Sequence, residues 1–141
     1  MKNFNHKAFI QVRFKDVDKM GHVNNANYLT YIEQARVKYF DDVIGHDKKW
    51  SQQMGIILAR IEIDYRSPVF FHDTIFVYTR CAQIGTKSIT LEWLIVREKD
   101  NSEEIVAQGI AVLVCYDYEH EKTIPVPDEH RRLMDAFEGR T

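Results

Sequence analysis

The side chains best suited to chemistry gather in one polar stretch, Asp16 to Tyr28, with the carboxylates Asp16 and Asp18, then Gly21 and His22. The apolar periodicity that follows predicts a helix. A carboxylate can activate water or attack a carbonyl carbon directly. The first turn of a helix offers unpaired N–H groups that stabilise negative charge developing on oxygen. These residue types in this order therefore predict a site for attack on a carbonyl group.

Each of these residues also has an ordinary structural explanation. Asp16 or Asp18 can satisfy loop amides, His22 can pack within the loop, and Asn24 and Asn25 are common cap residues. An Asp-x-Asp pair can hold a divalent cation, but the other oxygen ligands expected at calcium-loop spacing are missing. We therefore expect no metal here, and residue types alone leave the catalytic role open.

A long helix must position this stretch. Helical spacing of apolar residues predicts it over Ala26 to Ile44, with Asn24 or Asn25 as N-cap and Gly45 as the stop. The expected buried stripe consists of Tyr28, Leu29, Ile32, Ala35, Tyr39 and Val43. Such a stripe requires a broad apolar surface to cover it.

The remaining chain predicts strands and one short helix. The expected strands are Ala8 to Phe14, Ile61 to Arg66, Thr74 to Ile84, Ser88 to Arg97 and Ile105 to Tyr118, and the expected terminal helix is Asp128 to Phe137. The last strand is apolar on both faces, which indicates a central strand or one buried at an interface. The order predicts an α+β fold in which one antiparallel sheet wraps around the long helix.

Composition limits the function classes. The 141 residues predict a single domain, residues 1 to 141. A net charge of −2 without a basic stripe argues against nucleic acid, and no apolar run reaches the ~20 residues of a membrane span. The first residues, Met1 to His6, contain no apolar leader, so we expect a cytoplasmic protein. Cys81 and Cys115 are expected to be buried free thiols.

Two segments resemble a known family. The run from Val12 to Asp18 and from Gly21 to Tyr28, continuing to Glu33-Gln34-Ala35-Arg36, resembles the 4-hydroxybenzoyl-CoA thioesterase and acyl-CoA thioesterase branch of the hot-dog superfamily. It is also similar to the acyl-ACP thioesterases. Ile63 to Asp73 resembles the second strand of that family and the turn after it.

The resemblance implies a hot-dog fold, a five-stranded antiparallel sheet around a central helix. It further implies homodimers or homotetramers with the site at the dimer interface. The substrate class is a thioester of acyl-CoA or acyl carrier protein, hydrolysed without metal or redox cofactor. The catalytic carboxylate falls on Asp18, as general base or nucleophile, and the N–H near Asn25 polarises the carbonyl. The acyl-ACP branch places Asn and His where this chain has Met20 and His22, so only the His is retained and its role stays open.

Further residues are predicted to bind the substrate. We expect Gly21, Asn24 and Tyr28 to bind the substrate. Tyr28 and Tyr31 can line the acyl pocket, although tyrosines on a helix stripe are more often core residues. Lys87 and Ser88 can bind the phosphate groups of CoA, although the residues around them are also typical of an ordinary polar hairpin turn. Two alternatives remain at this point: a non-catalytic acyl-binding or scaffolding protein, and a hydratase or dehydratase of the same fold.

Overall fold

A computed structural model describes residues 1–47, 50–51 and 53–140. Its longest helix, α1 (Asn25–Val43), agrees with the predicted helix to within one residue at each end. The Asn24 side chain accepts a hydrogen bond from the Ala26 N–H at 2.9 Å, which caps the helix start. Gly45, with φ of +114°, follows the helix end, in a conformation that favours glycine.

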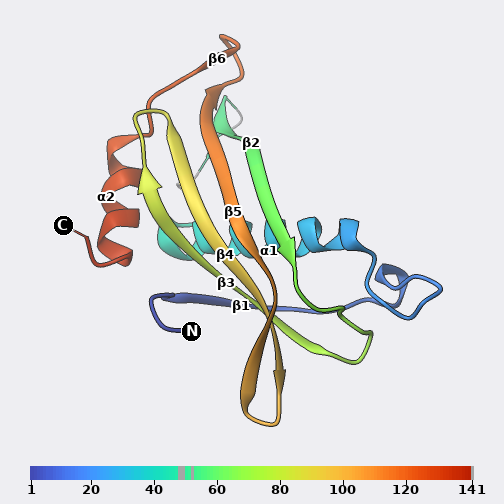
Figure 1. Cartoon of the computed structure of the whole chain (residues 1–141). Coiled ribbons are helices and arrows are strands. Elements are labelled where there is room, and N and C mark those ends of the chain that lie inside the picture. The colour runs from blue at the N-terminus through green and yellow to red at the C-terminus, as the bar shows by residue number, and fades with distance from the viewer. Residues whose placement is uncertain (48–49, 52, 141) are drawn as a thin grey trace.

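The strands form one antiparallel sheet against which α1 packs (Figure 1). Their spatial order is β1-β3-β4-β5-β2, and the short β6 pairs with β5. The bounds are β1 His6–Ile10, β2 Met54–Tyr65, β3 Thr74–Ile84, β4 Ser88–Lys99, β5 Ser102–Asp117 and β6 Lys122–Thr123. A second helix, α2 (Asp128–Phe137), agrees with the predicted terminal helix. The α+β prediction is confirmed, and β5 lies inside the sheet as its two apolar faces indicated.

The core fills the space between α1 and the inner face of the sheet. The first half of the helix packs Tyr31, Ile32 and Ala35 into one cluster with Trp93 of β4. The second half packs Tyr39, Phe40 and Val43 into another, which includes Met134 of α2 and both cysteines. The predicted stripe is therefore confirmed at all positions but Leu29, which is 40% exposed on its flank. Cys81 and Cys115 are buried and free, as predicted.

The predicted strands differ from the structure at β1, β2 and β6. β1 ends at Ile10, because the chain turns into a 3₁₀ helix at Phe14–Asp16 that leaves Phe14 81% exposed. β2 begins at Met54, seven residues before the predicted Ile61, because the apolar run there pairs with β5 without any alternation of polar residues to reveal it. The sheet also gains a sixth strand, the two-residue β6, whose exposed polar residues carry no strand pattern.

Gly109 permits the close approach of two strands and a large side chain. It pairs with Trp93 of β4 and with Ile63 of β2. A Cβ at this position would lie 2.7 Å from Cζ2 of the buried Trp93 and would overlap the backbone carbonyl of Glu62. Backbone atoms of a paired strand cannot move aside cheaply, so a methyl group here must distort the sheet.

We therefore expect Gly109→Ala to lower the free energy of unfolding by about 1–3 kcal/mol, the usual cost of overpacking. Urea denaturation followed by tryptophan fluorescence measures the change. The neighbouring Gln108→Ala, on the opposite face of β5, serves as control and should shift stability by no more than ~0.5 kcal/mol. Equal midpoints for both variants and the parent protein would contradict the close approach.

Candidate functional site

The turn before α1 has a defined hydrogen-bond pattern. The Gly21 N–H donates to the Asp18 carbonyl at 3.0 Å, and the Asp18 N–H donates to the His22 carbonyl at 2.8 Å. Val17 and Val23 pair as an antiparallel bridge on either side. Gly21 has φ of +85°, a region that side chains rarely adopt. Gly21 therefore closes the turn that carries Asp18, while its role in substrate binding stays a prediction.

Asp16 is buried and fully engaged in the structure. Its Oδ2 accepts from the Arg13 N–H at 3.0 Å and from the Tyr31 hydroxyl at 2.8 Å. Its Oδ1 accepts from the Arg13 guanidinium at 3.3 Å. Burial by itself raises the pKa of the Asp16 carboxyl, but these hydrogen bonds outweigh it and hold the pKa below its usual value. Its backbone carbonyl accepts from the Asn24 N–H and the Asn27 side chain, which ties the loop to the helix.

Asp18 has the opposite environment. Its side chain is exposed, and Oδ1 accepts a single hydrogen bond, from the Met20 N–H at 2.9 Å. Within the described part of the chain, Oδ2 has no hydrogen-bond partner. Residue types could not choose between the two carboxylates, but their surroundings separate them. Asp16 holds the loop together, whereas Asp18 is available to a substrate.

Within the described residues, the N–H of Asn25 at the start of α1 is a free donor. The Asn24 side chain occupies the Ala26 N–H, and the Asn24 carbonyl accepts from the Asn27 N–H at 2.9 Å. Among residues 1–47, 50–51 and 53–140, no atom accepts a hydrogen bond from the Asn25 N–H. The helix dipole adds partial positive charge at this end. A carbonyl oxygen can therefore be bound at Asn25, while Asn24 serves as the cap.

An open pocket of about 450 Å³ lies at this helix start. One side is formed by His22, Asn25 and Tyr28. The other side, here named the β2–β3 wall, consists of the end of β2 and the residues after it, Tyr65, Arg66, Ser67 and Pro68. The two sides touch where the Tyr65 hydroxyl donates to the Asn25 carbonyl at 3.2 Å and the Tyr28 hydroxyl donates to the Ser67 carbonyl at 3.4 Å.

The structure brings together most of the predicted site. His22, Asn25 and Tyr28 line the pocket, and the His22 ring packs edge-on against Phe70 at 5.3 Å. Asp18 lies in the adjoining turn and does not itself line the pocket of this single chain. One side of the pocket therefore comes from the loop before α1 and the first turn of that helix, and the other comes from the end of β2 and the residues after it.

Lys87 and Ser88 lie elsewhere. They belong to the hairpin between β3 and β4, where Lys87 Nζ donates to Thr123 Oγ1 at 3.1 Å. The wall connects to the opposite end of β3, which has 11 residues. At ~3.3 Å per residue the hairpin is about 30 Å from that end. Within one chain these two residues do not border the pocket, and their contact with CoA phosphates stays a prediction.

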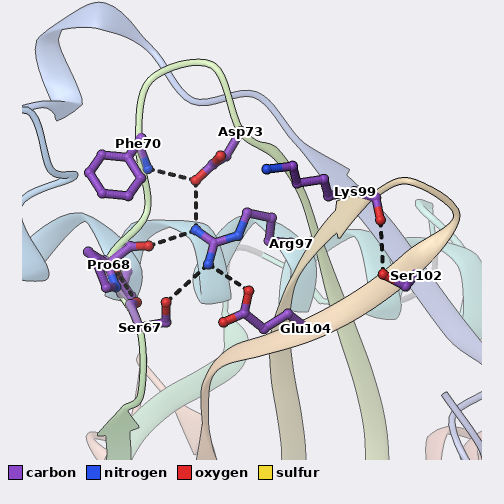
Figure 2. A network of polar contacts seen from close by, with 9 residues as sticks. Ser67, Pro68, Phe70, Asp73, Arg97, Lys99, Ser102 and Glu104 are labelled. Carbon is purple, nitrogen blue, oxygen red and sulfur yellow. Dashed lines mark hydrogen bonds and ion pairs between the residues drawn. The ribbon is translucent and has the colours of Figure 1, made fainter.

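The β2–β3 wall was not predicted as part of the site. Its residues fall within the second segment of the family resemblance, where Pro68 indicated only the end of a strand. Behind the wall, Arg97 of β4 lies at the centre of a polar network (Figure 2). No pattern in the sequence singled out that arginine.

Comparison of the sequence and the fold with known proteins shows the family of this chain. The model of the thioesterase-like superfamily matches residues 12–136. The chain belongs to the thioesterase-like superfamily. The match spans the Asp18 turn, α1, the strands β2 to β6 and nearly all of α2, and the solved structure of a thioesterase shares the fold, so the hot-dog fold predicted from the sequence is confirmed.

Several thioesterases are similar to this chain over most of their length. A thioesterase from Thermus thermophilus, crystallised with coenzyme A and zinc, is 35% identical with a TM-score of 0.81, covering 100% of this chain and 99% of that chain. The long-chain acyl-CoA thioesterase FadM of Escherichia coli (strain K12) is 27% identical over 128 residues, 91% of this chain and 96% of that protein. A thioesterase-superfamily structure from Jannaschia sp. CCS1, 23% identical, shares the fold with a TM-score of 0.83 over 95% of this chain and 83% of that one.

No helix in the described part of this superfamily member has the length and apolar character needed to cross a membrane. The long helix α1 instead carries charged residues on its exposed side, such as Glu33 and Lys38.

The Tyr31–Asp16 hydrogen bond should be measurable as pH-dependent stability. Because the folded-state pKa of Asp16 is lowered, its ionised form stabilises the fold above the usual carboxyl range, and this contribution is lost as pH falls through the folded pKa. We expect Tyr31→Phe to lower the free energy of unfolding at pH 7 by about 1.5–3 kcal/mol, as for hydrogen bonds to charged groups.

The loss of unfolding free energy in Tyr31→Phe should become smaller as Asp16 is protonated. Denaturation of the variant and the parent protein from pH 7 down to acidic pH tests whether the Tyr31 hydroxyl acts through the Asp16 carboxylate. Tyr116→Phe is the control, because that tyrosine does not contact Asp16. A Tyr31→Phe deficit that stays constant over the whole pH range would show that the hydroxyl does not act through the carboxylate.

Proposed function

We propose that this protein hydrolyses the thioester bond of an acyl-CoA, releasing a carboxylic acid and coenzyme A. The observation that carries the proposal is the free N–H of Asn25, a residue that lines the pocket, next to the turn that holds the exposed carboxylate of Asp18. The names of the relatives, an acyl-CoA thioesterase and a thioesterase crystallised with coenzyme A, support this substrate class.

In the proposed reaction the thioester carbonyl oxygen accepts a hydrogen bond from the Asn25 N–H. Asp18 then acts in one of two ways. As general base it takes a proton from water, whose oxygen attacks the carbonyl carbon. As nucleophile its oxygen attacks that carbon directly, and water later cleaves the resulting anhydride. In both routes the C–S bond breaks and the thiolate leaves, while the oxyanion is stabilised at the helix start.

The other predicted residues receive supporting roles in this proposal. His22 forms the pocket side next to the turn, and its carbonyl oxygen holds the Asp18 N–H. Tyr28 and the β2–β3 wall border the space for the acyl group. An acyl-carrier-protein thioester is an alternative substrate with the same reacting bond, and a cytoplasmic location is part of the same proposal.

We also propose that the active form is a dimer paired along β2. This 12-residue strand is an edge of the sheet and exposes Ile57 and Leu58. A long apolar edge with unpaired backbone groups favours pairing with another strand. Because Tyr65 at the end of the same strand lines the pocket, a partner paired along this edge would border the site. A homotetramer is compatible with such dimers.

We expect Asp18→Asn to reduce kcat by on the order of 10² to 10⁴ without loss of stability, because it removes the base or nucleophile and keeps an acceptor for the Met20 N–H. The assay is thiol release from acyl-CoAs of short, long and aromatic acyl groups. Asp16→Asn is the matched comparison, and should lower the free energy of unfolding instead. Near-normal kcat in Asp18→Asn would refute the role, and acyl-CoA binding without thiol release would favour the non-catalytic alternative.

We expect Ile57→Lys to convert the dimer to a monomer, because it places a charge in the exposed apolar part of the β2 edge. Light scattering after size-exclusion chromatography measures the mass, and thiol release should fall in parallel. Phe9→Lys is the control, since Phe9 is 62% exposed on β1, the other edge of the sheet. A monomeric parent protein with full activity would contradict the interface.

A further inference from the structure

The β2–β3 wall has a single side chain behind it that reaches several of its residues. Arg97, near the end of β4, donates from one terminal nitrogen to the Pro68 carbonyl at 2.8 Å and to Asp73 Oδ2 at 2.9 Å. Its other terminal nitrogen donates to Ser67 Oγ at 3.0 Å and to Glu104 Oε2 at 2.7 Å (Figure 2). The guanidinium therefore contacts both of the wall residues that are furthest from β2.

The same network reaches the other side of the pocket. Asp73 Oδ2, which accepts from Arg97, also accepts from the Phe70 N–H at 2.8 Å. The Phe70 ring packs against His22, and the neighbouring Val69 carbonyl accepts from the Val23 N–H at 2.7 Å. A displacement of Arg97 would therefore shift the β2–β3 wall and, through Asp73 and Phe70, the loop that carries Asp18.

Charge and burial make this arrangement specific for arginine. The side chain of Arg97 is 13% exposed, and it lies between the carboxylates of Asp73 and Glu104. Burial lowers the pKa of Arg97, but the hydrogen bonds to both carboxylates outweigh it, so the guanidinium stays charged. Its planar fork can serve four acceptors at once, whereas a lysine ammonium has three donors on a single nitrogen.

We propose that Arg97 is a positioning residue of the site, which sets the distance between the β2–β3 wall and the start of α1 and thereby selects the acyl group. It touches neither the reacting carbonyl nor the Asp18 carboxylate. It acts through Ser67 and Pro68, which line the pocket opposite Asn25 and Tyr28. The inference rests on the proposed thioester hydrolysis and goes beyond it, because it assigns acyl selectivity to a residue outside the pocket.

The test compares kcat and KM of Arg97→Lys with the parent protein over a series of acyl-CoAs of increasing chain length. A looser wall weakens binding of the acyl group in the ground state and the transition state alike, so KM should rise while kcat changes little. We expect kcat/KM for the best substrate to fall on the order of 10- to 100-fold, the size of effect that small displacements of a positioning group produce. The preference between chain lengths should become flatter.

Arg80→Lys is the matched control. Arg80 also pairs with a carboxylate, Glu92 at 2.9 Å, but its pair lies on β3 and β4 outside the pocket. Ser67→Ala removes one acceptor of Arg97 and should produce a smaller change in the same direction, which keeps the test usable if Arg97→Lys does not fold. Millimolar guanidinium should partly restore the selectivity of Arg97→Ala, and ammonium should not.

The outcomes separate this inference from the proposed function. Unchanged KM and selectivity in Arg97→Lys and Ser67→Ala, with an active parent protein, would overturn the positioning role alone. A lower melting temperature of Arg97→Lys with unaltered KM and selectivity would show that Arg97 only stabilises the fold, and would also overturn the positioning role. A parent protein that hydrolyses no acyl thioester would overturn the proposed function and this inference together.

Discussion

The buried carboxylate of Asp16 is the interaction on which the site depends. It joins the Arg13 backbone and guanidinium to the Tyr31 hydroxyl, and so ties the chain before α1 to the second turn of that helix. A buried carboxylate is stable only when hydrogen bonds and opposite charge compensate its loss of hydration. Here three donors do so, and the adjoining turn with Asp18 is thereby held at the helix start.

The helix α1 serves both the fold and the site. Its buried residues, among them Tyr31 and Ala35, form the centre of one core cluster. The Asn24 side chain caps Ala26, and the first N–H group of the helix, at Asn25, has no acceptor among the residues that the structure describes. The packing that stabilises the domain therefore also fixes the direction in which the free donor points, and no separate element is needed to place it.

The second side of the pocket has a different origin. The β2–β3 wall follows an edge strand and is held from behind by Arg97, through hydrogen bonds to backbone and side-chain oxygens. One side of the site is thus built on a packed helix and the other on a polar network. A polar network of this kind can be altered one contact at a time, which suits the proposed role of this surface in selecting the acyl group.

The sequence by itself determined much of this. Periodicity predicted α1 to within one residue, and the D-x-D-x-x-G-H-V-N-N pattern indicated the family and its fold, both of which are confirmed. These succeeded because helical periodicity, caps and a glycine with positive φ are local properties of the chain. Asp18, His22 and Asn25 as catalytic residues stay predictions, although the structure brings His22 and Asn25 to one pocket and Asp18 to the adjoining turn.

Only the tertiary structure decided the rest. It showed that Asp16 is buried and Asp18 exposed, and that the partners of Asp16 include Tyr31, 15 positions along the chain. It joined Ser67 to Arg97, 30 positions apart, and placed Lys87 at the far hairpin. Burial and long-range hydrogen bonds arise from how the strands pair around the helix, so the spacing of residues in the sequence does not reveal them.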